Sequence, residues 1–160
     1  MREPLVSAGD AGVELGINVH LAAYSMIFGG GGRVRVGPFV NLSSQVRCYT
    51  VSDDFRGDVL AGPTVPEEYR NVQRGDVTLE SCVLVGSGCL LLPGIILGEG
   101  SVVGAHTIVS KDVAAGAVVR GNPVREVGRR NVEVLRGLTR RYLESIGGSG
   151  SLDDVAGASR

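Results

Sequence analysis

The sequence contains no tryptophan, and aromatic residues make up only 4% of its 160 residues. It also lacks an apolar run of the roughly 20 residues that a membrane-spanning helix needs. Glycine is abundant, with 25 residues, yet a hydrophobic share of 43% argues against a disordered chain. We therefore expect a single thin and regular fold whose core is built from small and branched aliphatic side chains.

The positive and negative charges of the chain nearly balance, and it has few reactive side chains. Its net charge is −1, so we expect neither nucleic acid nor a membrane surface as a partner. The N-terminal segment "MREPLVSAGDAG" has no apolar signal-peptide core, and we expect a cytoplasmic location. The three cysteines form no Cys-x-x-Cys motif, so we interpret them as free structural thiols.

Aliphatic residues recur at every sixth position in the second half of the chain: Leu79, Val85, Leu91, Leu97, Val103 and Val109. A helix repeats every 3.6 residues and a strand every 2, so neither explains this period. Weaker copies run from Leu15 to Ile27 and from Val36 to Cys48, separated by a slip of three at "FGGGGRV". Six residues make a short strand and a bend, so three hexads form one triangular coil whose strands pair with the next coil. The spacing predicts an all-β fold, a parallel β-helix.

The ladder is interrupted once and followed by a helical pattern. Residues 52–76 have no repeat and carry six acids against three arginines, which is typical of a functional loop, although a solvated insertion is the plain alternative. Apolar residues at helical spacing after residue 129 predict a helix that covers the open end of the coils or packs on another subunit. We therefore expect a lead at 1–10, a β-helix domain at 11–128 with an inserted loop at 52–76, a helix at 129–146 and a disordered tail at 147–160.

The segment "GSGCLLLPGIILGEGSVVGAHTIVSKDVAAGAVVRGNPVREV" resembles the closing coils of the hexapeptide-repeat acyltransferases. It is most similar to the maltose/galactoside acetyltransferase-like branch of sugar acetyltransferases. The resemblance implies a left-handed parallel β-helix, a homotrimer, and acetyl-CoA bound between two subunits, with no metal. The cofactor-binding residues that it implies are Gly86, Gly104, Ala105, His106, Ser110, Lys111, Gly121, Asn122, Pro123 and Arg125.

The acceptor side departs from that family. The branch uses a histidine base in its long loop, and the aligned position here is Asp53. Asp53 and Asp54 are adjacent, so if both face the cleft, their like charges raise the pKa of one and make it a candidate catalytic base. With an amine acceptor, a carboxylate need only hold the ammonium form and receive a proton. The plain alternative is that "SDDF" caps a turn of the loop.

Only two histidines are present, and they lie too many coils apart to act as a pair. His20 belongs to the N-terminal coils, and His106 is expected to line the channel for the pantetheine arm of CoA. Taken alone, each is more often a structural residue than a catalytic one.

The sequence thus predicts a CoA-dependent acyltransferase, with acetyl as the expected group, that modifies a hydroxyl or amine of a sugar, sugar nucleotide or related small molecule at a trimer interface. A catalytically silent scaffold or binding protein is the alternative, because the usual histidine base is missing. A γ-type carbonic anhydrase shares this solenoid but needs three histidines on zinc, and two distant histidines argue against it.

Overall fold

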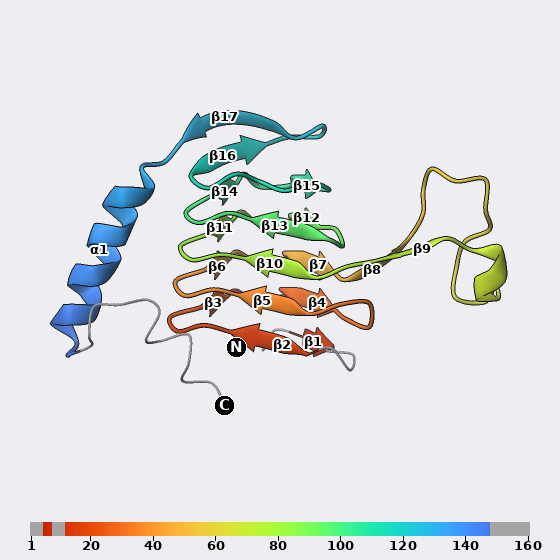
Figure 1. Cartoon of the computed structure of the whole chain (residues 1–160), viewed down its shortest axis with the longest axis horizontal. Coiled ribbons are helices and arrows are strands. Elements are labelled where there is room, and N and C mark those ends of the chain that lie inside the picture. Colours follow the sequence, from red (N-terminus) through yellow and green to blue (C-terminus); the bar gives the residue numbers. More distant parts are fainter. Residues whose placement is uncertain (1–4, 8–11, 148–160) are drawn as a thin grey trace.

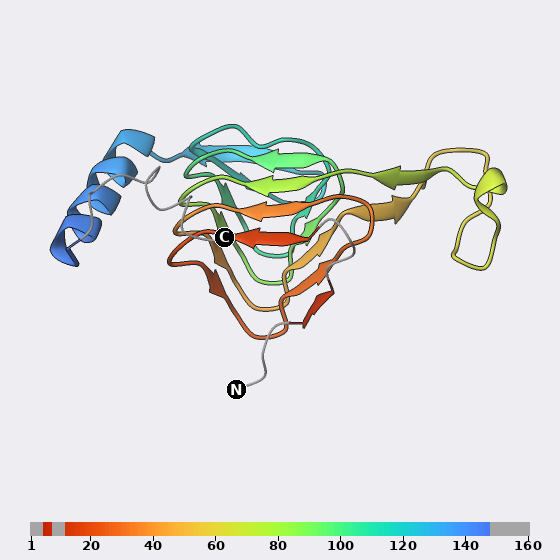
Figure 2. The ribbon, with the colours of Figure 1, turned by 60° about the horizontal axis from the view of Figure 1, so that its bottom comes forward.

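The computed structural model describes residues 5–7 and 12–147, and in this part the chain winds into a stack of triangular coils (Figures 1 and 2). Each coil contributes one short strand to each of three sheets. Sheet A contains β1 (Leu5–Ser7), β4 (Met26–Phe28), β7 (Arg47–Tyr49), β12 (Leu90–Leu91) and β15 (Ile108–Val109). Sheet B contains β2 (Val13–Leu15), β5 (Val34–Val36), β10 (Val77–Leu79) and β13 (Ile95–Leu97). Sheet C contains β3 (His20–Leu21), β6 (Asn41–Leu42), β11 (Leu84–Val85), β14 (Val102–Val103), β16 (Ala117–Arg120) and β17 (Arg125–Arg129).

Strands pair in parallel from coil to coil, in register with the sixfold ladder. Leu79, for example, lies between Val36 of the coil below and Leu97 of the coil above. The one antiparallel pair in these three sheets joins β16 to β17, within the described residues. The predicted parallel coil is therefore confirmed, and sheet A extends back to Leu5, before the expected domain start at residue 11.

The predicted ladder residues form the core. All six of the second ladder, from Leu79 to Val109, are buried. Full burial of one aliphatic side chain stabilises the fold by about 1.5–3 kcal/mol, so a column of them holds neighbouring coils together. Leu15 is an exception: it is exposed, because β2 is the end strand of sheet B.

The three corners of the triangle differ in what they carry. We call them the CA corner (between sheets C and A), the AB corner and the BC corner. The residue that turns each corner often has a left-handed backbone, as Tyr24 and His106 do at the CA corner and Phe39 at the BC corner. Few non-glycine residues adopt this conformation, so the coil geometry imposes it at these places.

The slip at "FGGGGRV" lies at the AB corner, where the glycines are needed for space. A Cβ atom on Gly31 would lie 2.2 Å from the carbonyl oxygen of Thr50, and one on Gly32 would lie 2.6 Å from the carbonyl of Gly75. Thr50 and Gly75 flank the insertion of the next coil. The glycines therefore let the two roots of the insertion stack directly on the coil below.

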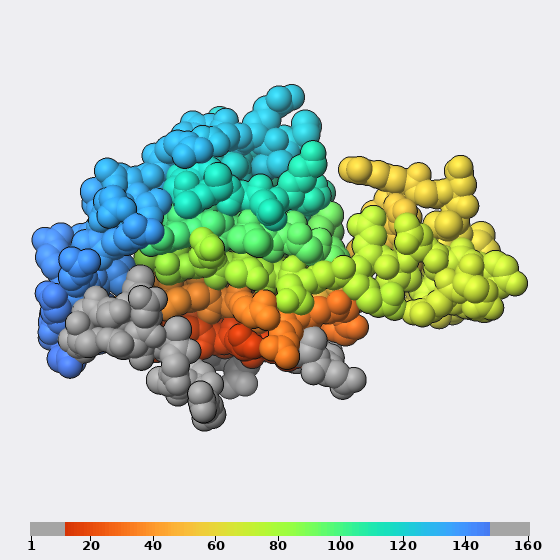
Figure 3. All heavy atoms as spheres, viewed as in Figure 1, coloured from red at the N-terminus to blue at the C-terminus, as the bar shows by residue number. Residues whose placement is uncertain are grey.

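The insertion is an antiparallel ribbon that projects from the AB corner (Figures 1 and 3). Strand β8 (Val51–Asp53) pairs with β9 (Val72–Arg74), and a single 3-10 turn, η1 (Glu67–Tyr69), lies near the far end. We call residues 51–74 the arm. The expected loop of 52–76 therefore contains two strands that the repeat pattern gave no sign of.

The helix α1 (Val132–Ser145) is present as expected but begins later than the expected residue 129. Arg129 belongs to β17, and Asn131 caps the helix by accepting a hydrogen bond from the Val134 backbone N–H at 3.2 Å. The helix runs along the BC corner rather than over the open end, which β17 covers instead (Figure 1). It is held there by Arg136, whose guanidinium donates to both carboxylate oxygens of Glu99.

No helix in the described ranges is long and apolar enough to cross a lipid bilayer. Apart from Gly147, the expected tail of 147–160 lies outside the described residues.

Candidate functional site

The predicted cofactor residues lie at the two corners that flank sheet A, near the C-terminal end of the stack. Gly86, Gly104, Ala105 and His106 lie at the CA corner, before strands β12 and β15. Ser110 and Lys111 follow β15 at the AB corner, and the arm leaves this same corner two coils earlier. The strands of sheet A run from the CA corner to the AB corner, so most of the predicted cofactor residues lie one strand length from the corner that carries the arm.

Gly86 and Gly104 are required by the stacking of the coils. A Cβ atom on Gly86 would lie 2.6 Å from the backbone nitrogen of Ala105, and one on Gly104 would lie 2.8 Å from the Cβ atom of Arg120. Both positions thus leave bare backbone at the CA corner, which a narrow cofactor arm can approach closely.

His106 is exposed at this corner, with a left-handed backbone at φ 57°. Its imidazole packs over Gly88 of the coil below, where a Cβ atom would lie 2.6 Å from Nδ1. His20 is on β3, the end strand of sheet C, and its Nδ1 lies 2.8 Å from Oδ1 of Asn41. His20 therefore lies on the first strand of sheet C, whereas His106 follows β14, three strands further along the same sheet.

Asn122 hydrogen-bonds to backbone groups along the last strand of sheet A. Its Oδ1 accepts a hydrogen bond from the Ile108 backbone N–H at 2.8 Å, and its Nδ2 donates to the carbonyl of His106 at 3.1 Å. Because β15 is the last strand of sheet A, this side chain takes the place of a further coil. Gly121 supports the same turn through its N–H, which donates to Oγ1 of Thr107 at 3.0 Å. The structural role was not foreseen, and a cofactor contact by Asn122 stays a prediction.

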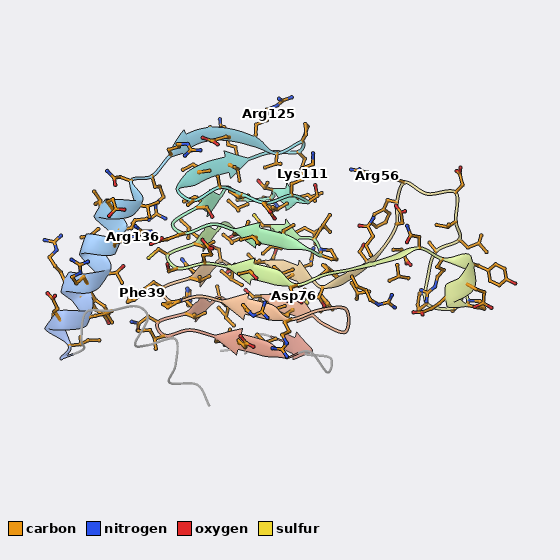
Figure 4. All side chains as sticks on the ribbon, viewed as in Figure 1. Phe39, Arg56, Asp76, Lys111, Arg125 and Arg136 are labelled. Atoms are coloured by element: carbon orange, nitrogen blue, oxygen red, sulfur yellow. The ribbon has the colours of Figure 1, made fainter. Side chains whose placement is uncertain are left out.

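The cationic side chains at this end come from three different elements. Lys111, the only lysine of the chain, is exposed at the AB corner, and Arg125 is exposed at the start of β17, after Pro123. In Figure 4 both lie at the C-terminal end of the stack, and Arg56 points from the arm toward the stack. Phosphate groups are bound by such clusters, with lysine acting as a point charge and arginine as a fork.

The predicted acceptor residues Asp53 and Asp54 lie at the outer end of β8, where the paired ribbon of the arm ends. Each of them contacts different partners. Oδ2 of Asp53 accepts a hydrogen bond from the Gly62 backbone N–H at 3.1 Å, and its Oδ1 lies 3.6 Å from the guanidinium of Arg70. The two carboxyl oxygens of Asp54 accept from the Arg56 backbone N–H and from the amide of Asn71, both at 2.8 Å. The arm thus fixes both side chains by separate sets of contacts.

These contacts stabilise the ionised form of Asp54. The backbone N–H of Arg56, followed by the amide of Asn71, holds the pKa of Asp54 below its ordinary value. The expectation that two neighbouring carboxylates raise the pKa of one is therefore wrong for Asp54, because its oxygens face hydrogen-bond donors. The contact with Arg56 is also the turn cap of the plain alternative, so Asp54 both caps the turn and stays ionised at neutral pH.

Asn71 was missed by sequence reasoning. It reaches Asp54 because β9 runs antiparallel to β8 with Val72 opposite Asp53. Nothing in the sequential spacing of these residues signals that pairing, since the ribbon follows neither the sixfold repeat nor a helical period.

The free thiols do not contribute to the site. Cys48 and Cys89 are buried in the coil core, and Cys82 is half-buried beside the helix at the BC corner. Burial raises the pKa of Cys48 to about 12 and also raises that of Cys89. Among the described residues, no three His, Cys, Asp or Glu side chains gather as ligands for a metal ion.

No family model matches the chain, but individual proteins do. The chain is 34% identical over 140 residues to the dTDP-4-amino-4,6-dideoxy-D-glucose acyltransferase of Escherichia coli, an alignment that covers 88% of the chain and 69% of that enzyme. It is also 39% identical over 71 residues to a 2,3,4,5-tetrahydropyridine-2,6-dicarboxylate N-acetyltransferase of Staphylococcus aureus, over 44% of the chain and 28% of that enzyme.

The solved structures agree with these relatives. A variant of AntD, an N-acyltransferase from Bacillus cereus, solved with dTDP and coenzyme A, superimposes with a TM-score of 0.81 at 33% identity, covering 89% of the chain and 74% of AntD. Another AntD variant, solved with dTDP-4-amino-4,6-dideoxyglucose and coenzyme A, has a TM-score of 0.77 at 32% identity, covering 88% of the chain and 77% of AntD.

Proposed function

Because the chain belongs to the hexapeptide-repeat acyltransferases that use CoA thioesters, we propose that it transfers an acyl group, with acetyl as the expected group, to the amine of a nucleotide-linked amino sugar. The E. coli relative is named for dTDP-4-amino-4,6-dideoxy-D-glucose, and AntD has been solved with that sugar nucleotide and with coenzyme A. The sequence left hydroxyl and amine acceptors open. The relatives that cover most of the chain favour the amine.

We further propose that the coil is left-handed and that the protein is a homotrimer with CoA between two subunits. The left-handed coil and the trimer rest on the resemblance of the closing coils to the hexapeptide-repeat family. Binding of CoA is supported by the AntD complex and by the position of the predicted cofactor residues at the corners beside one sheet. Ile108 in the outward face of that sheet is exposed, which leaves apolar surface for a cofactor or a neighbouring subunit. A homotrimer and a cytoplasmic location stay predictions.

In this proposal, the C-terminal coils hold the cofactor. Lys111 and Arg125 bind its phosphates, while the bare backbone at Gly86 and Gly104 receives the pantetheine arm, beside Ala105 and His106. Ser110, Gly121, Asn122 and Pro123 complete the walls of the site. The N–H groups of Gly86 and Gly104 already donate within the stack, to the carbonyls of Val103 and Val119, so the pantetheine arm packs against this backbone without taking those bonds.

The acceptor binds on the side of the arm, where Asp53 and Asp54 are the proposed catalytic residues. At neutral pH a sugar amine arrives as an ammonium ion, which the ionised carboxylate of Asp54 attracts and binds. The ammonium ion first loses one proton to solvent water, and the neutral nitrogen attacks the thioester carbonyl carbon. As the C–S bond of the tetrahedral intermediate breaks, the second proton of the nitrogen passes to the sulfur, and CoA leaves as a thiol.

The amino sugar nucleotide solved with AntD is the observation that carries the choice of an amine, and the hydrogen bonds that keep the pKa of Asp54 low agree with it. A carboxylate of low pKa is a weak base and is poorly suited to deprotonating a hydroxyl group. It is well suited to holding a cation, and an amine needs no stronger base to become a nucleophile.

The proposal is tested by comparing two acceptors that differ in one group. Purified protein is incubated with acetyl-CoA and either dTDP-4-amino-4,6-dideoxyglucose or its 4-hydroxy counterpart, and release of the CoA thiol is followed. We expect release with the amine and at least about a hundredfold less with the hydroxyl, the loss of roughly 2.7 kcal/mol of transition-state stabilisation. Equal turnover of both sugars contradicts the choice of an amine.

The alternative of a silent scaffold is separated by calorimetry. If neither sugar is turned over and acetyl-CoA shows no binding heat at millimolar concentration, the chain is a scaffold rather than an enzyme. Binding of acetyl-CoA without turnover of either sugar leaves an acyltransferase whose acceptor belongs to another class.

A further inference from the structure

The far end of the arm exposes apolar side chains that no part of the described chain covers. Leu60 is 61% exposed and Tyr69 is 58% exposed, and Val59 lies beside them in the same shallow hollow. The backbone of this end is ordered by its own contacts, since the Leu60 N–H donates to the carbonyl of Tyr69 at 3.0 Å. An ordered apolar end on a projecting ribbon is typical of a segment that docks on another surface.

A second apolar surface lies at the BC corner, between helix α1 and the coils. A groove of about 540 Å³ opens there, lined by Asn18, Val19, Phe39, Leu138, Thr139 and Tyr142. The rings of Phe39 and Tyr142 meet edge to face, with centroids 5.8 Å apart, and form the floor. Leu138 and Tyr142 are each about half exposed, so the groove is unfilled by the described residues.

The charges of the two surfaces are complementary. The inserted residues 52–76 carry six acids and three arginines, whereas residues 125–147, which contain helix α1, carry six arginines and three acids. Near the apolar surfaces themselves, Asp58 and Glu68 of the arm and Arg140 and Arg141 of the helix are exposed. Opposite charge at the rim of an interface steers the approach of two partners and fixes their orientation.

Within one chain these surfaces cannot meet, because the arm and the helix project from opposite sides of the stack (Figures 1 and 2). They do lie at a similar level along the stack. In Figure 4 the short turn η1 near the end of the arm stands at nearly the height of Phe39 in the groove. A copy rotated about an axis parallel to the stack therefore brings its groove to the level of the arm of the first copy.

We propose that the end of the arm of one copy docks in the helix groove of the next copy, with Leu60 and Tyr69 as its apolar anchors. The contact is head-to-tail, so it repeats around a ring and closes if the rotation per copy suits. A ring of three copies corresponds to the trimer proposed above, and the inference rests on the proposed function to that extent.

Docking also holds the part of the arm that carries the proposed catalytic residues. The arm carries Asp53 and Asp54 at the outer end of its ribbon, and within one chain only its roots at Thr50 and Gly75 stack on the coils. With its far end bound to the neighbouring copy, the arm spans the space between two stacks. The neighbour then completes the acceptor site by fixing the position of the arm over sheet A.

The test is disulfide cross-linking of the full chain. Tyr69→Cys and Leu138→Cys are introduced together, the protein is oxidised with copper phenanthroline, and products are separated on a non-reducing gel. We expect covalent species that end at three chains and disappear with reductant. Chains carrying only one of the two changes, mixed and allowed to exchange, should yield a linked pair, because the contact joins different copies.

The matched control replaces Tyr24, a tyrosine with similar exposure at the CA corner, in combination with Leu138→Cys. Linking no greater than in this control overturns the proposal. A ladder longer than three chains supports the docking but contradicts the ring of three. Acyl transfer is not part of this readout, so failure of the docking and failure of the proposed function are distinguishable.

A second variant pair guards against cross-links formed by chance collision. Leu138→Asp places a charge in the groove, whereas Val134→Asp places one on the same helix outside the residues that line it, at a similarly exposed position. The molar mass from light scattering should fall to that of smaller species in Leu138→Asp only. An unchanged mass in both variants contradicts docking in this groove.

Discussion

Each strand of the coil stack from β4 to β7 and from β10 to β16 buries at least one apolar side chain, whereas no residue of the arm, 51–74, is fully buried. In the stack, each aliphatic ladder residue packs on its counterpart in the next coil, and these side chains are buried. The arm is held by polar contacts that occur once each, such as the bond of Asp54 to Asn71 and the ion pair of Arg74 with Glu67 at 2.6 Å. Exposed ion pairs stabilise a fold by only about 0–1 kcal/mol each.

The difference between buried, repeated contacts and exposed polar ones suits the two regions to different kinds of binding. A surface built from repeated, buried contacts is rigid, which suits the binding of a cofactor of constant structure. A ribbon held by weak polar contacts can change in sequence without loss of the core, which suits recognition of a particular acceptor. The two regions meet at the AB corner, beside sheet A, where we propose that the acyl group is transferred.

The largest effect is expected from breaking the stack. In β13, Ile95 is 1% exposed and its neighbour Ile96 is 46% exposed on the opposite face. Ile95→Ala should lower the free energy of unfolding by about 2–5 kcal/mol, because it leaves a cavity in the column. Ile96→Ala should lower it by less than about 1 kcal/mol. Urea titration measures both, and equal losses contradict the assignment of inward and outward faces.

The next largest effect is expected in the arm, and on turnover instead of stability. Asp54→Asn removes the charge that holds the ammonium group, so kcat/KM for the amino sugar should fall by roughly tenfold to a hundredfold, as for the loss of a charged hydrogen bond. Glu67→Gln removes an exposed charge from the same arm and should leave turnover unchanged. If the Asp53→Asn and Asp54→Asn variants both retain full activity, the acceptor does not bind at these carboxylates.

The fold could be predicted from the sequence because the coil is periodic. The position of Leu91 inside one coil implies the position of Leu97 in the next, so a local rule repeats into a complete architecture. The same rule fails at the helix, since the contact of Arg136 with Glu99 joins segments that no period relates. The predicted helix therefore exists but does not cover the open end of the coils, and its packing on another subunit stays a prediction.

Less of the candidate site than of the fold could be predicted from the sequence. Motifs in the closing coils predicted the residues along sheet A, but the role of Asn122 as a substitute for a further coil depends on where the stack ends. In the arm, the pKa of Asp54 depends on Asn71, seventeen positions away and reached through an irregular ribbon. Such pairings follow from tertiary geometry and not from spacing.

A smaller effect is expected at the cationic end of the stack. Lys111→Ala removes one charge next to the proposed phosphate site and should raise KM for acetyl-CoA by about tenfold or less, with little change in KM for the sugar. An amine-reactive label offers a direct check, because Lys111 is the only lysine. Acetyl-CoA should protect it from labelling, and equal labelling with and without acetyl-CoA contradicts this placement.

The smallest effect concerns the buried thiol of Cys48, whose pKa is raised by burial to about 12. A raised pKa in the folded state contributes stability that is present below the ordinary thiol pKa and is lost as pH rises toward the folded value. Unfolding free energy should therefore drop by about 1 kcal/mol between pH 8 and pH 10. The drop should be smaller in Cys48→Ala, and an identical drop in that variant assigns the loss to other groups.

The division of labour between the stack and the arm is tested most directly by hydrogen exchange of the unmodified protein with each substrate alone. Acetyl-CoA should slow exchange in residues 104–111 and 121–125, and the dTDP-linked amino sugar should slow exchange in the arm, residues 51–74. If both substrates protect the same segment, or if the sugar protects only the C-terminal coils, the two regions do not hold the two substrates and the proposed site is wrong.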